Sequence, residues 1–175
     1  MTELSKYTSF RVGGPAQKIV QVSTEAEIIA AIEEAGDSPL LIMGGGTNVL
    51  IADKGFDGTV IRISNNSVQS EVDACSGATL TIGAGEDWDT FVQTTIDRGY
   101  AGLETLSGIP GTVGAAPVQN IGAYGVELAD SFVSLSAFDT TTLNTVEINK
   151  DTPNPVVDVM PEQKVNLSDK KYGGT

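Results

Sequence analysis

The sequence predicts a fold that combines α-helices and β-strands in two successive units. Two segments, 24–35 and 87–98, repeat apolar residues at the spacing of an amphipathic helix. Short apolar runs bounded by turn residues lie before and after each of them, which predicts strands. The chain has 175 residues and is 40% hydrophobic, which suffices for the core of one substantial domain or two small ones.

The first unit, residues 1–66, follows a β-α-β-β order. Its helix is predicted at 24–35, because Ser23 or Thr24 can cap the N-terminus and Gly36 can end it. The apolar residues at helical spacing, interpreted as core, are Ile28, Ile29, Ile32 and Ala35. The predicted strands are Ile19–Val22, Leu40–Met43 and Val60–Ile63.

The second unit begins with a predicted strand at Thr79–Gly83 and a helix at 87–98. Asp87 can cap this helix and Gly99 can end it. Two further strands are predicted at Ser131–Phe138 and Thr145–Ile148, joined by a turn around 140–144. The predicted inner face of the helix consists of Trp88, Phe91, Val92, Thr95 and Ile96.

The net charge of −13 limits the classes of partner. Nucleic acids and anionic membranes require basic surfaces, so neither is expected. A chain of this charge also repels anionic ligands unless a local basic cluster offsets the field. The sequence shows no such cluster.

Composition also bears on location and metal chemistry. No run of about 18 apolar residues could span a membrane, and the N-terminus lacks the regions of a signal peptide. We therefore expect a cytoplasmic protein. The single cysteine, Cys75, fits a reducing compartment and is interpreted as a small buried hydrophobic residue. One Cys and no His argue against a transition-metal site.

Two glycine-rich segments are the strongest functional signal. Leu40–Met43 is followed by Gly44, Gly45, Gly46, Thr47 and Asn48, an arrangement that presents backbone donors to a phosphate. Residues 101–128 contain six glycines and two prolines, which excludes an ordinary helix or central strand. Such backbone allows a ligand to approach closely. A tight turn is the alternative for the three glycines alone.

Familiar nucleotide motifs do not explain these segments. No P-loop pattern is present. Gly83-Ala84-Gly85 begins a dinucleotide pattern, but Trp88 stands where the third glycine is required.

A longer pattern is more specific, and its last part, 109–127, is long and irregular. The pattern resembles the UDP-N-acetylenolpyruvoylglucosamine reductase family, also called UDP-N-acetylmuramate dehydrogenase or MurB, in its type I form. The resemblance covers roughly residues 4–148. The matching stretches are Ser9–Ala16, Gly44–Leu50, Gly83–Trp88 followed by Phe91-Val92 and Gly102-Leu103-Glu104, and Ile109–Glu127.

The resemblance implies an α+β fold, a two-subdomain FAD-binding domain of the vanillyl-alcohol-oxidase and MurB type. The two subdomains would span 1–68 and 69–150, with FAD between them. The family converts UDP-N-acetylglucosamine enolpyruvate to UDP-N-acetylmuramate, a peptidoglycan precursor. The implied ligands are FAD, NADPH as hydride donor and a UDP-sugar.

The resemblance also implies which residues contact FAD. The pyrophosphate loop would be Gly44, Gly45, Gly46, Thr47, Asn48, Val49 and Leu50. The flavin and ribityl path would be lined by Ile109, Pro110, Gly111, Gly114, Ala115 and Ala116. The isoalloxazine or adenine portions would lie against Pro117, Gln119, Gly122 and Ala123.

Several nearby residues have a structural alternative. Gln119 and Asn120 either bind ring atoms or satisfy loop backbone, and Tyr124 either contacts ligand or packs. Arg11 is interpreted as pairing with a carboxylate, and Glu104 as ordering the loop backbone. Trp88 is interpreted as core.

No catalytic residue is identifiable. The family's Tyr-Arg pair and its Gly-Ser-Phe-Phe motif, which carries the proton-donating serine, are both absent from the sequence. Residues 151–175 are interpreted as a tail with 151–161 and 168–175 loosely structured. Similarity at 154–157, and at 164–168 to a later stretch that opens a helix, suggests a remnant left by an internal deletion. A polar tail with chance similarity is the alternative.

Three functions follow as hypotheses. The chain is the flavin-binding part of a reductase and inactive as it stands, or it is a non-catalytic flavin-binding module. An oxidase of the same fold is disfavoured, because many of those attach flavin through His or Cys. This chain has no His, and Cys75 lies outside the matching loops.

Overall fold

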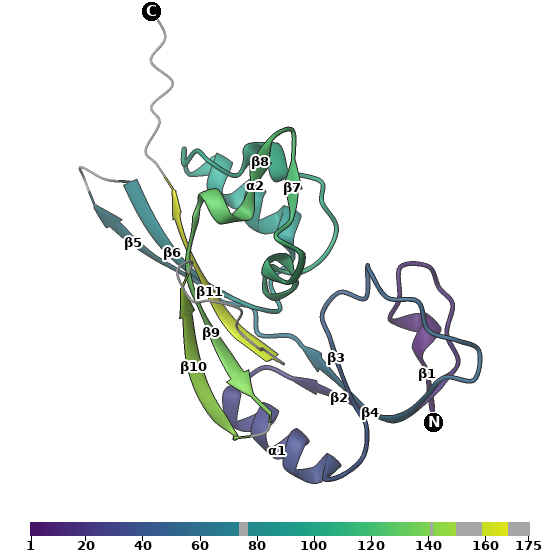
Figure 1. Ribbon diagram of the computed structural model, residues 1–175. Coiled ribbons are helices and arrows are strands. Elements are labelled where there is room, and N and C mark those ends of the chain that lie inside the picture. The colour runs from purple at the N-terminus through teal and green to yellow at the C-terminus, as the bar shows by residue number, and fades with distance from the viewer. Residues whose placement is uncertain (74–76, 141, 150–158, 168–175) are drawn as a thin grey trace, which may run out of the picture.

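Two β-sheets, each covered by helices or 3-10 turns, make up the structure (Figure 1). The computed structural model describes residues 1–73, 77–140, 142–149 and 159–167. The first sheet has four strands and the second has five, and a separate two-stranded hairpin packs beside the second.

The first sheet is mainly parallel. Strands β2, β4 and β3 run in one direction, and only the short edge strand β1 is antiparallel. Parallel strands end at a common edge, where α/β folds place their ligands. In spatial order, the strands are β1 (Thr2–Glu3), β2 (Pro15–Val22), β4 (Phe56–Ile63) and β3 (Leu40–Met43).

Helix α1 (Glu25–Ala35) confirms the first predicted helix. Thr24 caps it: the Thr24 hydroxyl accepts from the Glu27 backbone N–H at 3.2 Å, while the Glu27 carboxylate accepts from the Thr24 N–H. This is a capping box, and Gly36 ends the helix as expected. Ile28 and Ile32 are buried in a cluster that includes Phe138 of the second sheet, so α1 helps to join the two sheets.

The second sheet is antiparallel throughout. Helix α2 (Trp88–Asp97) and several 3-10 turns pack on it around a cluster of buried residues. In spatial order, its strands are β10 (Asn144–Asn149), β9 (Phe132–Asp139), β11 (Val159–Leu167), β6 (Gly77–Gly83) and β5 (Val68–Asp73).

Helix α2 also begins and ends as predicted. The Asp87 carboxylate accepts from the Thr90 N–H at 2.9 Å. Trp88 is 1% exposed, and its indole N–H donates to the Leu106 carbonyl at 2.9 Å, which confirms its core role. The prediction is wrong for Ile96, which is 37% exposed. At 100° per residue Ile96 lies about 90° from the centre of the buried face, at its margin.

The prediction of a tail over residues 151–175 is wrong for Val159–Leu167, which form strand β11. This strand occupies the centre of the second sheet, hydrogen-bonded to β6 on one side and β9 on the other. Residues 164–167 are therefore extended and do not open a helix. Val165 and Leu167 of this strand are buried. The expectations for Cys75, 151–158 and 168–175 concern residues outside those described.

Edge strands β1 and β5 were missed because they are short or polar. The proposed subdomain boundary after residue 68 falls one residue into β5, which pairs with β6. The division into subdomains stays a prediction. In the described part of the chain, no helix is long and apolar enough to cross a membrane.

We expect Val165→Ala to lower the free energy of unfolding by about 2 kcal/mol, because it leaves a cavity between sheet and helix. Val165 is 0% exposed. Val146→Ala on edge strand β10, where the side chain is 45% exposed, is the matched control and should change stability by less than about 0.5 kcal/mol. Urea unfolding monitored by circular dichroism measures both. Equal effects would contradict a central β11.

Candidate functional site

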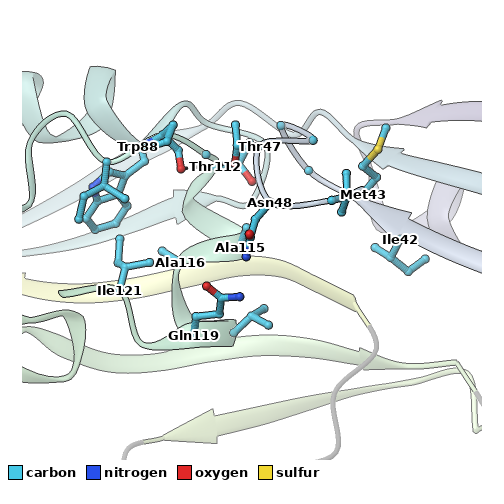
Figure 2. Close-up of a pocket in the computed structure, with 18 residues that line it drawn as sticks. Ile42, Met43, Thr47, Asn48, Trp88, Thr112, Ala115, Ala116, Gln119 and Ile121 are labelled. Atoms are coloured by element: carbon cyan, nitrogen blue, oxygen red, sulfur yellow. Dashed lines mark hydrogen bonds between the residues drawn. The ribbon is translucent and has the colours of Figure 1, made fainter. Parts of the chain in front are cut away.

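The two glycine-rich segments meet in one cleft of about 280 Å³ (Figure 2). The first segment follows β3 at the carboxyl edge of the parallel strands, and the second follows α2. The Thr47 hydroxyl donates to the Pro110 carbonyl at 3.4 Å, which links the segments across 63 positions. The fold thus assembles the cleft from both signals that the sequence provides.

Most of the predicted FAD-contacting residues line this cleft, although contact with FAD itself stays a prediction. Figure 2 shows Asn48 and Gln119, which come from the two different segments, among the lining residues. The predicted residues found in the lining are Gly44, Gly45, Gly46, Thr47, Asn48, Val49, Ile109, Pro110, Gly111, Ala115, Ala116 and Gln119.

The other five predicted residues lie outside the lining, so their contact with FAD remains a proposal. Leu50 is 80% exposed, and Gly122 and Ala123 form strand β7 of a small hairpin with β8 (Val126–Glu127). Pro117 lies within a 3-10 turn. Gly114 packs on Ala84: its N–H donates to the Ala84 carbonyl at 2.9 Å, and a Cβ would lie 2.5 Å from the Ala84 Cβ.

Sequence reasoning omitted six lining residues from the predicted set. Ile42 and Met43 end strand β3, a position that could have indicated them. Trp88 is both core and cleft wall, so its assignment to the core alone was incomplete. The remaining three, Thr112, Val118 and Ile121, lie within the second glycine-rich segment.

The three consecutive glycines have different roles. A side chain at Gly46, whose φ is +67°, would collide with the Tyr7 carbonyl. A Cβ at Gly44 would lie 2.5 Å from the Thr112 hydroxyl oxygen. Around Gly45, no atom lies within 3.5 Å of the Cβ position. Gly46 is therefore required by the backbone of Tyr7, and a side chain at Gly44 would require Thr112 to move, whereas a Cβ at Gly45 would only reach ordinary contact with Thr47, Gly111 and Thr112.

Hydrogen bonds to α2 hold the second segment in place. The Asp89 carboxylate accepts from the Gly108 N–H at 2.6 Å and from the Ser107 hydroxyl at 2.8 Å. The Trp88 N–H donates to the Gly111 carbonyl at 3.0 Å. These hydrogen bonds, from Gly108 first and Ser107 second, lower the pKa of Asp89 because they favour the ionised carboxylate.

The structure decides between ligand contact and a structural role for several residues of the second glycine-rich segment. Asn120 satisfies the loop, accepting from the Ala129 N–H at 3.0 Å and donating to Glu127 at 2.8 Å. Glu104 accepts from the Gly102 N–H at 2.7 Å, which confirms its ordering role. The packing interpretation of Tyr124 is wrong, since this residue is 92% exposed in a turn with positive φ.

No residue that lines the cleft is charged or titratable. The lining offers backbone groups, the amides of Asn48 and Gln119, two threonine hydroxyls and apolar side chains. This donor set fits FAD, whose pyrophosphate can be bound by backbone N–H groups and whose rings pack on apolar residues. The cleft volume of about 280 Å³ is near the lower end of the range for small-molecule sites, so the cleft can enclose part of such a dinucleotide. The lining contains no general acid or base.

Two predictions about the basic residues are wrong: that Arg11 pairs with a carboxylate, and that the protein has no cluster of basic residues. Within the residues described, Lys18 and Glu34 form an ion pair, and Arg11 forms none. Instead, Arg11, Lys6 and Arg62 line a second hollow that shares Gly45 with the cleft. Arg62 is 51 positions after Arg11 in the sequence, and only folding brings it to the same hollow. Local sequence patterns therefore could not predict this cluster.

Comparison of the sequence with known proteins identifies its family and several relatives. The model of the FAD binding domain family matches residues 16–143. The chain is 44% identical over 148 residues to a UDP-N-acetylenolpyruvoylglucosamine reductase of Streptomyces coelicolor, covering 83% of this chain and 37% of that protein. It is 47% identical over 144 residues to the enzyme of the same name from Saccharopolyspora erythraea, covering 81% and 39%.

A solved structure supports the same relationship. The crystal structure of UDP-N-acetylenolpyruvylglucosamine reductase (MurB) from Thermus caldophilus is similar with a TM-score of 0.73 at 26% identity, covering 95% of this chain and 60% of that one. The chain thus spans less than two-fifths of the length of the two curated relatives.

We expect Asp89→Ala to lower the urea midpoint at pH 7, because the Gly108 and Ser107 donors lose their acceptor. The pKa of Asp89 is lowered in the folded state, so its stabilisation is present above the unfolded pKa of about 3.9 and is lost as the pH falls through the lower folded pKa. The difference between wild type and variant should therefore narrow below about pH 4.

Asp97→Ala, on the same helix, is the control, because Asp97 accepts only from the Gln93 side chain at 3.2 Å among the bonds described. It should show no comparable narrowing. A wild-type advantage over Asp89→Ala that persists unchanged at pH 2 would contradict the assignment.

Proposed function

The chain belongs to the FAD binding domain family, and we propose that it is the flavin-binding part of a UDP-N-acetylenolpyruvoylglucosamine reductase. The observation that carries the proposal is the meeting of two glycine-rich segments at the carboxyl edge of a parallel sheet, in a cleft without charged side chains. The identity of 44–47% to reductases of this name supports it.

Within this proposal, the chain's residues bind and orient the cofactor. The three glycines that line the cleft carry no side chain, so phosphate oxygens can approach N–H groups of the loop after β3. The amides of Asn48 and Gln119 supply directional hydrogen bonds, and Trp88 and Ile121 form an apolar wall that excludes water. When bound, FAD supplies hydride transfer between a nicotinamide donor and a substrate.

The reaction of the whole enzyme would use NADPH to reduce the enolpyruvyl double bond of a UDP-sugar, giving UDP-N-acetylmuramate. This step would place the protein in cytoplasmic peptidoglycan synthesis and thereby in cell-wall formation, cell shape and division. The cleft's lining includes no titratable group to protonate a product. We therefore propose that this chain binds FAD and does not complete the reaction by itself.

We expect the chain, incubated with FAD and desalted, to retain a shifted flavin spectrum. Gly45→Val should weaken FAD binding at least tenfold in a fluorescence titration, because its Cβ would already contact the cleft residues Thr47, Gly111 and Thr112 and its methyl groups would crowd the cleft. Ser70→Val, at an exposed position on edge strand β5, adds the same side chain away from the cleft and should bind like wild type. A colourless wild-type protein would refute the flavin assignment for this chain.

We also expect no substrate-dependent NADPH oxidation by the FAD-loaded chain, because the sequence lacks the family's Tyr-Arg pair and serine-bearing motif and the described lining of the cleft contains no titratable side chain. Absorbance at the nicotinamide band, followed with and without UDP-N-acetylglucosamine enolpyruvate, measures this. Turnover above the substrate-free rate would show that the chain carries catalytic residues after all.

A further inference from the structure

A second hollow, of about 550 Å³, adjoins the flavin cleft at Gly45, which lines both. Its lining includes Lys6, Arg11 and Arg62 and contains no acidic residue. The chain has only ten lysines and arginines against 23 acidic residues. Three cations without a carboxylate among them are therefore a local reversal of the protein's charge.

The fold fixes these cations at one place. Lys6 ends the first 3-10 turn, and Arg11 follows in a turn with a positive φ of +54°. Arg62 comes from the carboxyl end of β4, where it is the register partner of Met43 in β3. The Arg62 guanidinium lies 5.5 Å from the centre of the Tyr7 ring, a cation–π contact that orients it.

The hollow and the flavin cleft share one backbone segment. Gly45 lines both. The Ser9 N–H donates to the Gly46 carbonyl at 3.0 Å, and the Tyr7 carbonyl occupies the space that a Gly46 side chain would need. The basic turn is therefore anchored directly on the loop proposed to bind the pyrophosphate.

The chemistry of the lining selects an oxyanion. Guanidinium groups bind phosphate oxygens through paired N–H donors, and an ammonium adds a point charge. The hydroxyls of Ser5 and Ser9 are further polar groups of the same lining. Since both hollow and cleft adjoin Gly45, the anion best matched to this position is part of a nucleotide.

We propose that this hollow is a phosphate subsite that binds a phosphate group of a nucleotide ligand beside the flavin cleft. The identity of the nucleotide rests on the proposed function: the phosphate belongs either to FAD or to a second nucleotide such as NADPH or a UDP-sugar. The subsite offsets the repulsion that a chain of net charge −13 exerts on such anions.

The test compares two double variants of equal net charge. Lys6→Gln with Arg11→Asn removes two cations of the hollow, and Asn tolerates the positive φ at position 11. Lys54→Gln with Arg98→Gln removes two exposed cations elsewhere. Inorganic pyrophosphate is titrated calorimetrically at an ionic strength of about 0.15 M. The hollow variant should bind about tenfold more weakly than wild type, as loss of close charge pairs predicts.

The control variant should stay within about twofold of wild type, since Lys54 and Arg98 are exposed and lie outside the lining of the hollow, and salt at this ionic strength screens exposed charges beyond about 8 Å. An equal loss of pyrophosphate affinity in both double variants would show that only net charge matters and would overturn the subsite. Unchanged pyrophosphate affinity in the hollow variant would overturn it as well. Ser9→Asp, which places a carboxylate in the hollow at an exposed position, should weaken binding as well and guards against misfolding of the double variant.

Titration with FAD then identifies the source of the phosphate. If the hollow variant also binds FAD more weakly and saturating FAD displaces pyrophosphate, the phosphate is that of FAD. If FAD binds equally and pyrophosphate still binds the loaded protein, a second nucleotide is the ligand. Both results support the subsite. A wild-type chain that binds pyrophosphate through the hollow but no FAD would refute the proposed function alone.

Discussion

The glycine loop after β3 is held between two other backbone segments, and the site depends on this close approach. On one side Gly46 touches the Tyr7 carbonyl, and on the other Gly44 lies against Thr112. Neither contact leaves room for a Cβ, so the N-terminal turn, the loop and the second glycine-rich segment must be positioned together. Between these two glycines lies Gly45, which lines both the cleft and the second hollow.

This arrangement separates charge from the flavin cleft. The cleft is lined by backbone, amides and apolar side chains, whereas the cations lie in the hollow on the N-terminal turn. The uncharged cleft binds through directional hydrogen bonds. A cation at the margin of the cleft can attract an anion without paying the desolvation cost of burying its own charge. The acidic protein thus presents a locally positive approach to a neutral binding surface.

Local signals predicted both helices with their caps, strand β3 to the residue, and the two segments that meet in the cleft. Strand β11 was missed because its sequence includes a proline and little regular alternation of apolar and polar residues, and because its position depends on pairing with β6 and β9, which are distant in sequence. The cation cluster was missed for the same reason, since Arg62 joins Lys6 and Arg11 only through the parallel sheet. Local periodicity carries no information about such long-range pairing.

The cleft's apolar wall couples cofactor binding to stability. Val118 lines the cleft yet is 68% exposed, and Ile121 beside it packs only partly against the core. A bound ring system that covers such side chains gains about 25 cal/mol for each Å² of apolar surface removed from water. Because this gain exists only in the folded state, a cofactor at 100 times its Kd stabilises the fold by about 2.7 kcal/mol. The segment between α2 and β9 already packs on the core through Leu106, Val113 and Leu128, so a bound ring would add to this packing at the exposed side of the cleft, where Val118 lies.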